Sequence, residues 1–256
     1  MQKGQETVVQ NSSGWWYIGT DGKVDFHKNT VAPNEYGWWA VRNGAVDFQL
    51  NGIASNESGD WYCRGGQVDF GVAGVLESET EGFSGWYYIQ NGCVQKGQET
   101  VKQNSNGWWY IGTDGKVDFH KNTVAPNEYG WWAVRNGAVD FQLNGIASNE
   151  SGDWYCRGGQ VDFGAAGVLE SETEGFCGWY YIQNGCVQKG QETVKQNSNG
   201  WWYIGTDGKV DFGFSGIASN ENGTWYIENG KVNFNYSGTY EDENGRIYEI
   251  KSGNAA

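Results

Sequence analysis

The sequence predicts an all-β fold, a β-solenoid of about ten successive β-hairpins of roughly 22 residues with a degenerate C-terminal capping hairpin. The composition is rich in glycine, with 41 residues, and in aromatic residues, at 16%, which favours short strands and tight turns. Residues 37–48 (GWWAVRNGAVDF) predict a hairpin, because aromatic and β-branched residues flank an Asn-Gly pair. Variants of this stretch recur along the whole chain, which indicates a repeat array.

Side-chain alternation divides this expected hairpin into two faces, with Asn43 and Gly44 as a two-residue type I′ turn. One face carries the apolar side chains of Trp39, Val41, Val46 and Phe48. The other face carries Trp38, Ala40 and Asp47. We expect the first face to lie in the core, and the second, where an aromatic ring stands beside a carboxylate, to form a surface or a binding site.

The hairpins are grouped into longer blocks. Segment 1–93 matches segment 94–186 except at five positions, and a third copy follows the pattern as far as Phe212. We therefore expect a single array over residues 1–256, with block 1 (1–93), block 2 (94–186), a partial block 3 (187–240) and a C-terminal cap (241–256). The cap segment keeps the hairpin outline but lacks tryptophan, and charged residues replace the outer aromatics, as suits a terminal repeat that faces solvent.

The segments between the hairpins, such as residues 51–59, are predicted to be short extended pieces that cross to the next hairpin. Ile53 and Ile146 are expected to point inward from them. The acidic runs at 77–81 and 170–174 are interpreted as solvated loops.

The charge balance restricts the possible partners. The formal net charge is −14, which disfavours nucleic acid and anionic membranes and suits cationic ligands and neutral sugars. No segment reads as a signal peptide or a membrane span. Met1 stands where the copies have Val94 and Val187, so we expect a fragment of a larger secreted protein located extracellularly on a bacterial cell surface.

The five cysteines do not predict a disulfide framework or a zinc site, because their number is odd and no Cys/His spacing fits a metal. Cys63 and Cys156 are expected to be buried free thiols on the core face. Cys93 and Cys186 follow turn glycines and are expected to be exposed, and Cys177 replaces the serine at position 84.

The repeats resemble a known family in residues 14–18 (GWWYI), 22–26 (GKVDF) and 52–57 (GIASNE). Units of this form resemble the cell-wall-binding repeats of Gram-positive, Clostridia-type surface proteins, which are similar to choline-binding and glucan-binding repeats. The resemblance implies a β-solenoid with a non-catalytic binding role. In the choline-binding relatives, aromatic side chains from consecutive repeats hold a quaternary ammonium. One of those aromatic positions follows a glycine in the linking segment, where this chain has Ile53 or Val75.

The candidate ligand-binding residues are the outer tryptophans, the tyrosines two positions further on, and the aspartates opposite them. They are Trp15, Tyr17, Asp25, Trp38, Asp47, Trp86, Tyr88, Trp108, Tyr110, Asp118, Trp131, Asp140, Trp179, Tyr181, Trp201 and Tyr203. Such a set can stack on a sugar ring and bond its hydroxyls, or hold a cation. The alternative is that the outer rings only pack against the next repeat.

An enzyme is not expected, and no cofactor or metal is predicted. The two histidines, His27 and His120, are repeat copies, and the third copy has Gly213 there. The expected function is multivalent binding of cell-wall polysaccharide or another glycan. The alternatives are an adhesin for a host glycoprotein, such as mucin or an immunoglobulin, and a structural stalk.

Overall fold

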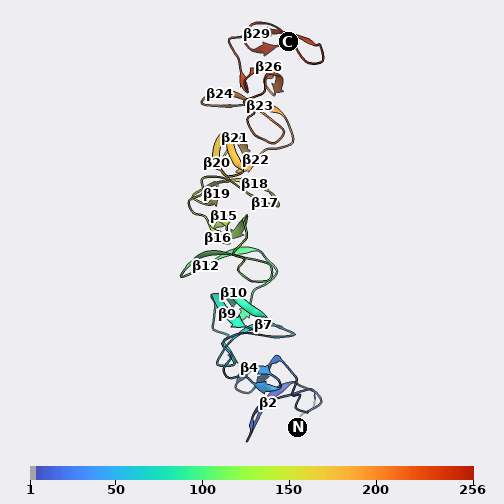
Figure 1. Cartoon of the computed structure of the whole chain (residues 1–256), viewed down its shortest axis with the longest axis vertical. Coiled ribbons are helices and arrows are strands. Elements are labelled where there is room, and N and C mark those ends of the chain that lie inside the picture. Colours follow the sequence, from blue (N-terminus) through green and yellow to red (C-terminus); the bar gives the residue numbers. More distant parts are fainter. Residues whose placement is uncertain (1–3) are drawn as a thin grey trace. The chain divides into compact units, whose positions relative to one another are not determined.

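The computed structural model describes residues 4–256, and all regular structure in that range is β-strand (Figure 1). None of these residues belongs to a helix that is long and apolar enough to cross a membrane. The chain forms two compact units. One contains the residues up to Lys121 together with 136–139, and the other contains Asn122–Arg135 and Asp140–Ala256.

The first sheet lies in the first unit and has eleven strands. Their order is β1-β2-β5-β4-β8-β7-β11-β10-β9, with β3 paired to β4 and β6 paired to β7. The strands are β1 (Thr7–Asn11), β2 (Gly14–Ile18), β3 (Thr30–Asn34), β4 (Gly37–Arg42), β5 (Ala45–Val46), β6 (Gly52–Asn56), β7 (Gly59–Arg64), β8 (Gln67–Val68), β9 (Gly74–Thr80), β10 (Phe83–Gln90) and β11 (Cys93–Val94).

The same pattern continues in the rest of the chain. In the first unit, β12 (Thr100–Asn104) pairs with β13 (Gly107–Ile111), which pairs with β16 (Ala138–Val139). In the second unit the order is β15-β19-β18-β22-β21-β20, with β14 paired to β15 and β17 paired to β18. These strands are β14 (Thr123–Asn127), β15 (Gly130–Arg135), β17 (Gly145–Asn149), β18 (Gly152–Arg157), β19 (Gln160–Val161), β20 (Gly167–Thr173), β21 (Phe176–Gln183) and β22 (Cys186–Val187).

The third sheet belongs to the second unit and has the order β23-β24-β27-β26-β30-β29-β28, with β25 paired to β26. Its strands are β23 (Thr193–Asn197), β24 (Gly200–Ile204), β25 (Gly216–Asn220), β26 (Gly223–Glu228), β27 (Lys231–Val232), β28 (Gly238–Glu241), β29 (Ile247–Lys251) and β30 (Asn254–Ala255). The segment expected to cap the chain contributes β29 and β30.

The repeating unit of the sheets is a three-stranded meander. β3 pairs with β4, and β4 then turns at Asn43-Gly44 to pair with β5. Both turn residues have positive φ, 48° and 76°, as the predicted type I′ turn requires. The linking segments are thus paired strands, whereas we expected them only to cross between hairpins. The inward position of Ile53 and Ile146 is confirmed, because both are 0% exposed.

The predicted hairpin is shorter than expected. β5 ends at Val46, and Trp39 of β4 pairs with Gln67 of the next repeat, where we expected it to pair with Phe48. Phe48 therefore leaves the ladder, lies in a turn and is 44% exposed. Ala40, which we placed on the outer face, is 0% exposed because the next repeat covers it. The core placement of Val41 and Val46 is confirmed.

Turn glycines connect consecutive repeats. The amide of Gly66 donates to the carbonyl oxygen of Leu50, and the carbonyl oxygen of Gly66 accepts from the amide of Ala40. A Cβ at this glycine would lie too close to the carbonyl oxygen of Asp47. The backbone of one repeat is therefore packed directly on the next, and the buried clusters lie between repeats, as in the group formed by Val31, Ala40, Leu50, Cys63 and Val68.

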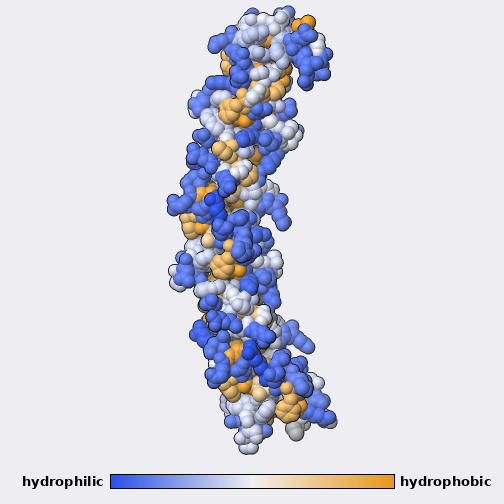
Figure 2. Space-filling model, viewed as in Figure 1, coloured by the Kyte–Doolittle hydropathy of each residue, from blue (hydrophilic) through white to orange (hydrophobic). Residues whose placement is uncertain are grey.

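The surface is mixed. Figure 2 shows hydrophilic residues over much of the visible face, with apolar patches between them. Exposed large apolar side chains include the turn phenylalanines Phe26, Phe48, Phe70, Phe119, Phe141, Phe163, Phe212 and Phe234.

Candidate binding site

Three aromatic rings meet where one repeat packs on the next. The outer tryptophan of one repeat, Trp15, lies beside the inner tryptophan of the following repeat, Trp39, and its turn phenylalanine, Phe48. The ring centroids are 5.1 Å apart for Trp15 and Trp39, 5.8 Å for Trp15 and Phe48, and 5.6 Å for Trp39 and Phe48. We call such a set of outer tryptophan, inner tryptophan and turn phenylalanine an aromatic trio.

The aromatic trio recurs in both units with nearly the same geometry. Between outer and inner tryptophans, the centroid distances in the further trios are 5.1–5.5 Å, and between outer tryptophans and phenylalanines they are 5.9–6.4 Å. These trios are Trp38–Trp61–Phe70, Trp131–Trp154–Phe163, Trp179–Trp202–Phe212 and Trp201–Trp225–Phe234. Most ring pairs are edge-to-face, the arrangement that aromatic quadrupoles favour.

An asparagine in the linking strand fixes each inner tryptophan. The Trp61 indole N–H donates to Asn56 Oδ1 at 3.0 Å, and the same oxygen accepts the amide of Ser58 at 2.9 Å. The Asn56 amide group donates to the carbonyl oxygen of Val31, in the preceding repeat, at 3.0 Å. One side chain thus accepts the hydrogen bond of the half-buried indole and connects two repeats. In the sequence the signal is an asparagine that recurs five residues before each inner tryptophan.

One trio surrounds a distinct cavity. Trp86, Trp109 and Phe119 line a hollow of about 320 Å³ together with Val117, Asn104 and Asn106. Asn104 Oδ1 accepts the Trp109 indole N–H at 3.0 Å, so this oxygen already has a hydrogen-bond partner within the wall of the hollow. The hollow is lined mainly by aromatic carbon and contains no charged side chain, which suits a small ligand group with an apolar surface.

The outer tryptophans predicted as ligand-binding residues are all half-buried. They are Trp15, Trp38, Trp86, Trp108, Trp131, Trp179 and Trp201. Trp38, for example, packs on the buried cluster that contains Cys63 and contacts the Trp61 ring. One part of the Trp38 ring thus supports the fold, and another part is exposed to solvent.

Three predicted tyrosines are buried beneath the trios. Tyr17 and Tyr110 are each 2% exposed and Tyr203 is 5% exposed. Burial, followed by a hydrogen bond to Glu192, raises the pKa of Tyr203 to about 12. Burial and the hydrogen-bonded Glu6 carboxylate likewise raise the pKa of Tyr17. These three rings are thus mainly part of the interior that supports the junctions.

The other two predicted tyrosines are half-buried and already contact an ammonium group. Lys102 Nζ lies 5.1 Å from the Tyr88 ring centroid, and Lys195 Nζ lies 5.2 Å from that of Tyr181. These distances are within cation–π range. At these two rings the cation is a lysine of the same chain.

The predicted aspartates have a local structural role. One carboxylate oxygen of Asp25, Asp47, Asp118 and Asp140 accepts the backbone amide two residues later, at 2.9–3.0 Å. This is the Asx arrangement that stabilises turns. Asp47 Oδ2 also lies 3.6 Å from Arg42 Nε. The aspartates hold the turn that presents the phenylalanine, and no group of metal-ligating side chains occurs among residues 4–256.

The turn phenylalanines and inner tryptophans are the site residues that sequence reasoning missed. Both were assigned to the core because the hairpin was expected to continue through Phe48. The available signal was the recurrence of phenylalanine directly after Val-Asp, where Asp is a turn-forming residue.

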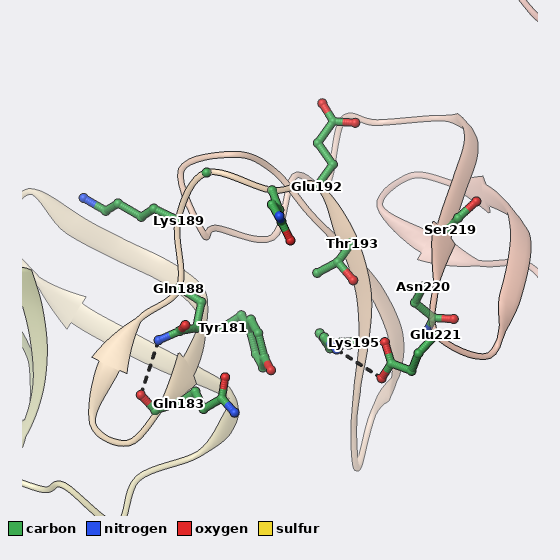
Figure 3. Close-up of a pocket in the computed structure, with 12 residues that line it drawn as sticks. Tyr181, Gln183, Gln188, Lys189, Glu192, Thr193, Lys195, Ser219, Asn220 and Glu221 are labelled. Carbon is green, nitrogen blue, oxygen red and sulfur yellow. Dashed lines mark hydrogen bonds and ion pairs between the residues drawn. The ribbon is translucent and has the colours of Figure 1, made fainter.

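A second hollow, in the second unit, is polar (Figure 3). It has a volume of about 770 Å³ and lies between β21, the loop that follows β22, β23 and the end of β25. Its lining consists of Tyr181, Gln183, Gln188, Lys189, Gly190, Gln191, Glu192, Thr193, Lys195, Ser219, Asn220 and Glu221. In this hollow, Lys195 Nζ donates hydrogen bonds to both carboxylate oxygens of Glu221, each at 3.1 Å. We call this hollow the polar groove.

The family of the chain follows from its repeats. The model of the choline-binding repeat matches residues 6–25, 28–47, 51–69, 84–95, 121–140, 144–162, 178–188 and 213–233, more than half of the chain. The chain therefore belongs to the choline-binding repeat family, which confirms the resemblance seen in the sequence.

Solved structures of pneumococcal proteins are similar in fold. CbpJ of Streptococcus pneumoniae shares 16% identity over 98% of this chain and 94% of its own, with a TM-score of 0.35. Choline binding protein F of Streptococcus pneumoniae shares 16% identity over 98% and 93%, with a TM-score of 0.39. The modular autolysin LytC of the same organism shares 12% identity over 98% of this chain and 52% of its own, with a TM-score of 0.35. No curated protein sequence matches the chain.

Proposed function

We propose that this chain is a non-catalytic binding module of a bacterial surface protein, and that its aromatic trios bind the quaternary ammonium of choline groups on a cell-wall polymer. The observation that carries the proposal is the trio itself, which recurs at equivalent junctions in a chain made of choline-binding repeats. We further infer that the repeats continue as a β-solenoid, and that the module is part of a larger secreted protein located on the cell surface.

The geometry of a trio suits a compact cation. Three centroids about 5–6 Å apart leave a point roughly 4 Å above their plane that is about 5 Å from each, within the range of cation–π attraction. A trimethylammonium group is weakly hydrated and carries apolar methyl groups, so the rings replace its water at little cost. The net charge of −14 adds a general attraction for cations.

Phe119→Ala tests this proposal at the cavity lined by Trp86, Trp109 and Phe119. The variant loses one of three rings, and choline affinity at that junction is expected to fall about tenfold, since a cation–π contact is worth roughly 0.5–2 kcal/mol. Phe26→Ala is the matched control, because Phe26 has the same Val-Asp-Phe context and contacts the inner tryptophan Trp16, while residues 4–13 contain no outer tryptophan. Choline titration followed by calorimetry measures both. Equal affinity in a folded Phe119→Ala protein would contradict the proposal.

Carbohydrate binding is a second candidate function, and the polar groove favours it. Amide, hydroxyl and carboxylate groups line the groove with the Tyr181 ring, and such groups bond sugar hydroxyls. Gln191→Ala with Ser219→Ala is expected to weaken binding of purified wall glycan at least threefold and to leave choline affinity unchanged. Unchanged glycan binding in the folded variant would show that the polar groove does not bind the glycan.

The host-glycoprotein alternative predicts contacts at the acidic runs 77–81 and 170–174, but these residues mostly belong to the strands β9 and β20. The run at 77–81, which we expected to be a solvated loop, mostly belongs to β9, and Ser78 is 2% exposed. Ser78 Oγ accepts the amide of Ile53 at 3.2 Å, so this arm packs on the preceding repeat.

A further inference from the structure

One junction in each block departs from the aromatic trio at every position. In block 1 the third hairpin has Asp60 where the other three hairpins have an outer tryptophan. The next hairpin supplies Tyr87 where the others have an inner tryptophan, and Lys96 where they have the turn phenylalanine. The second block repeats the change with Asp153, Tyr180 and Lys189. The three replacements therefore occur together.

The replaced residues interact with each other. Asp60 is 8% exposed, accepts a hydrogen bond from the Ser55 hydroxyl and forms an ion pair with the Lys96 ammonium. The carboxylate thus occupies the junction in place of a ring, and an ammonium from the same chain neutralises it. The second copy repeats this contact for contact, with Asp153, Ser148 and Lys189.

Tyr87, the one aromatic ring left at this junction, already contacts a lysine of the same chain. Lys116 Nζ lies 5.7 Å from the Tyr87 ring centroid, and in the second copy Lys209 Nζ lies 5.7 Å from that of Tyr180. A ligand cation at this junction would find one ring of three, and that ring is already in contact with an ammonium. It would also be repelled by two lysines of the same charge.

We propose that the Asp60–Lys96 and Asp153–Lys189 pairs close their junctions to the cationic ligand. This inference rests on the proposed function and deepens it by specifying which junctions bind. In block 1, the junctions that begin at Trp15, Trp38 and Trp86 are open and the junction at Asp60 is closed. Three junctions that bind the ligand are therefore interrupted by one that does not. A polymer is bound through its cationic groups only at the open junctions.

The number of choline molecules bound per chain at saturation tests the inference by equilibrium dialysis. Asp60→Ala with Lys96→Ala is expected to leave this number unchanged, whereas the matched variant Trp86→Ala is expected to bind one choline fewer. Circular dichroism and the urea midpoint establish that each variant is folded. Loss of a bound choline in the Asp60/Lys96 variant alone would overturn the inference. Absence of binding to the wild-type chain would instead overturn the proposed function, and the inference with it.

A second measurement needs no variant. The rates at which an amine-reactive reagent labels Lys96 and Lys189 are compared with and without saturating choline, by mass spectrometry of the intact wild-type protein. Both rates are expected to stay the same within twofold, while indole oxidation at Trp86 slows. Strong protection of Lys96 and Lys189 would show ligand at the closed junctions and would overturn the inference.

Discussion

Single asparagine side chains hold the binding surface in place. Each linking-strand asparagine accepts the indole N–H of the inner tryptophan five residues later, as Asn149 does for Trp154 at 3.0 Å and Asn220 for Trp225 at 2.9 Å. Their amide groups donate to the carbonyl oxygens of Val124 and Val194 in the preceding repeat. The hydrogen bond to the half-buried indole and the contact between repeats therefore depend on the same residue.

Asn56→Ala is expected to lower the free energy of unfolding by about 1–3 kcal/mol, because the partly buried Trp61 indole N–H loses its acceptor. The contacts to Ser58 and Val31 are lost as well. Urea denaturation measures the change, and Glu57→Ala, at the exposed next position, is the control. Equal stability of the two variants would show that this asparagine does not anchor the indole.

Among the elements, the tight turns determine how repeats approach each other. The Gly66 turn residue bonds to the preceding repeat through both its amide and its carbonyl oxygen. Gly82, at the β9–β10 turn, has a similar φ of +81°, but a Cβ added to it would have no other atom within 4 Å. The two glycines share a backbone conformation and differ in their surroundings.

Gly66→Ala and Gly82→Ala separate these two effects. Positive φ alone is expected to cost Gly82→Ala about 1 kcal/mol of the free energy of unfolding. Gly66→Ala is expected to cost at least about 2 kcal/mol more, because its Cβ meets the backbone of Asp47. Urea denaturation compares them. A similar cost for both would mean that the approach between repeats is not tight at Gly66.

The sequence allowed the turns to be predicted, because Asn-Gly pairs determine their geometry locally. The sequence did not reveal where β5 ends. The alternation of apolar and polar residues at 45–48 is compatible with a longer hairpin, but the strand ends early because Trp39 pairs with Gln67 of the next repeat. The same contact exposes Phe48, so the turn phenylalanines of the site could not be located by local patterns. The outer tryptophans could be singled out from the sequence, because they recur at one position of the repeat.

At the scale of the whole molecule, repetition and charge act together. Many equivalent trios on a chain of net charge −14 favour a polymer that carries many cationic groups, since linked weak contacts give high avidity. The contributions of the repeated cores to stability also add up along the chain, because each buried cluster joins neighbouring repeats.

Stability is expected to fall at alkaline pH. Burial raises the pKa of the Cys63 and Cys156 thiols from an ordinary 9.0 to about 12, so the folded state favours the protonated form. This contribution is fully present below about pH 9 and is lost as the pH rises toward about 12. Urea denaturation across this range measures it, and Cys63→Ala with Cys156→Ala should flatten the profile. A wild-type profile no steeper than that of the variant would contradict the assignment.

Binding of choline at the aromatic trios is tested by an NMR measurement of nuclear Overhauser contacts between the N-methyl protons of choline and the ring protons of the protein. We expect contacts to tryptophan indole and phenylalanine ring protons in the wild-type protein, and weaker contacts at Trp86 and Trp109 in Phe119→Ala. Methyl contacts only to surface carboxylate side chains, or none at saturating choline, would contradict it.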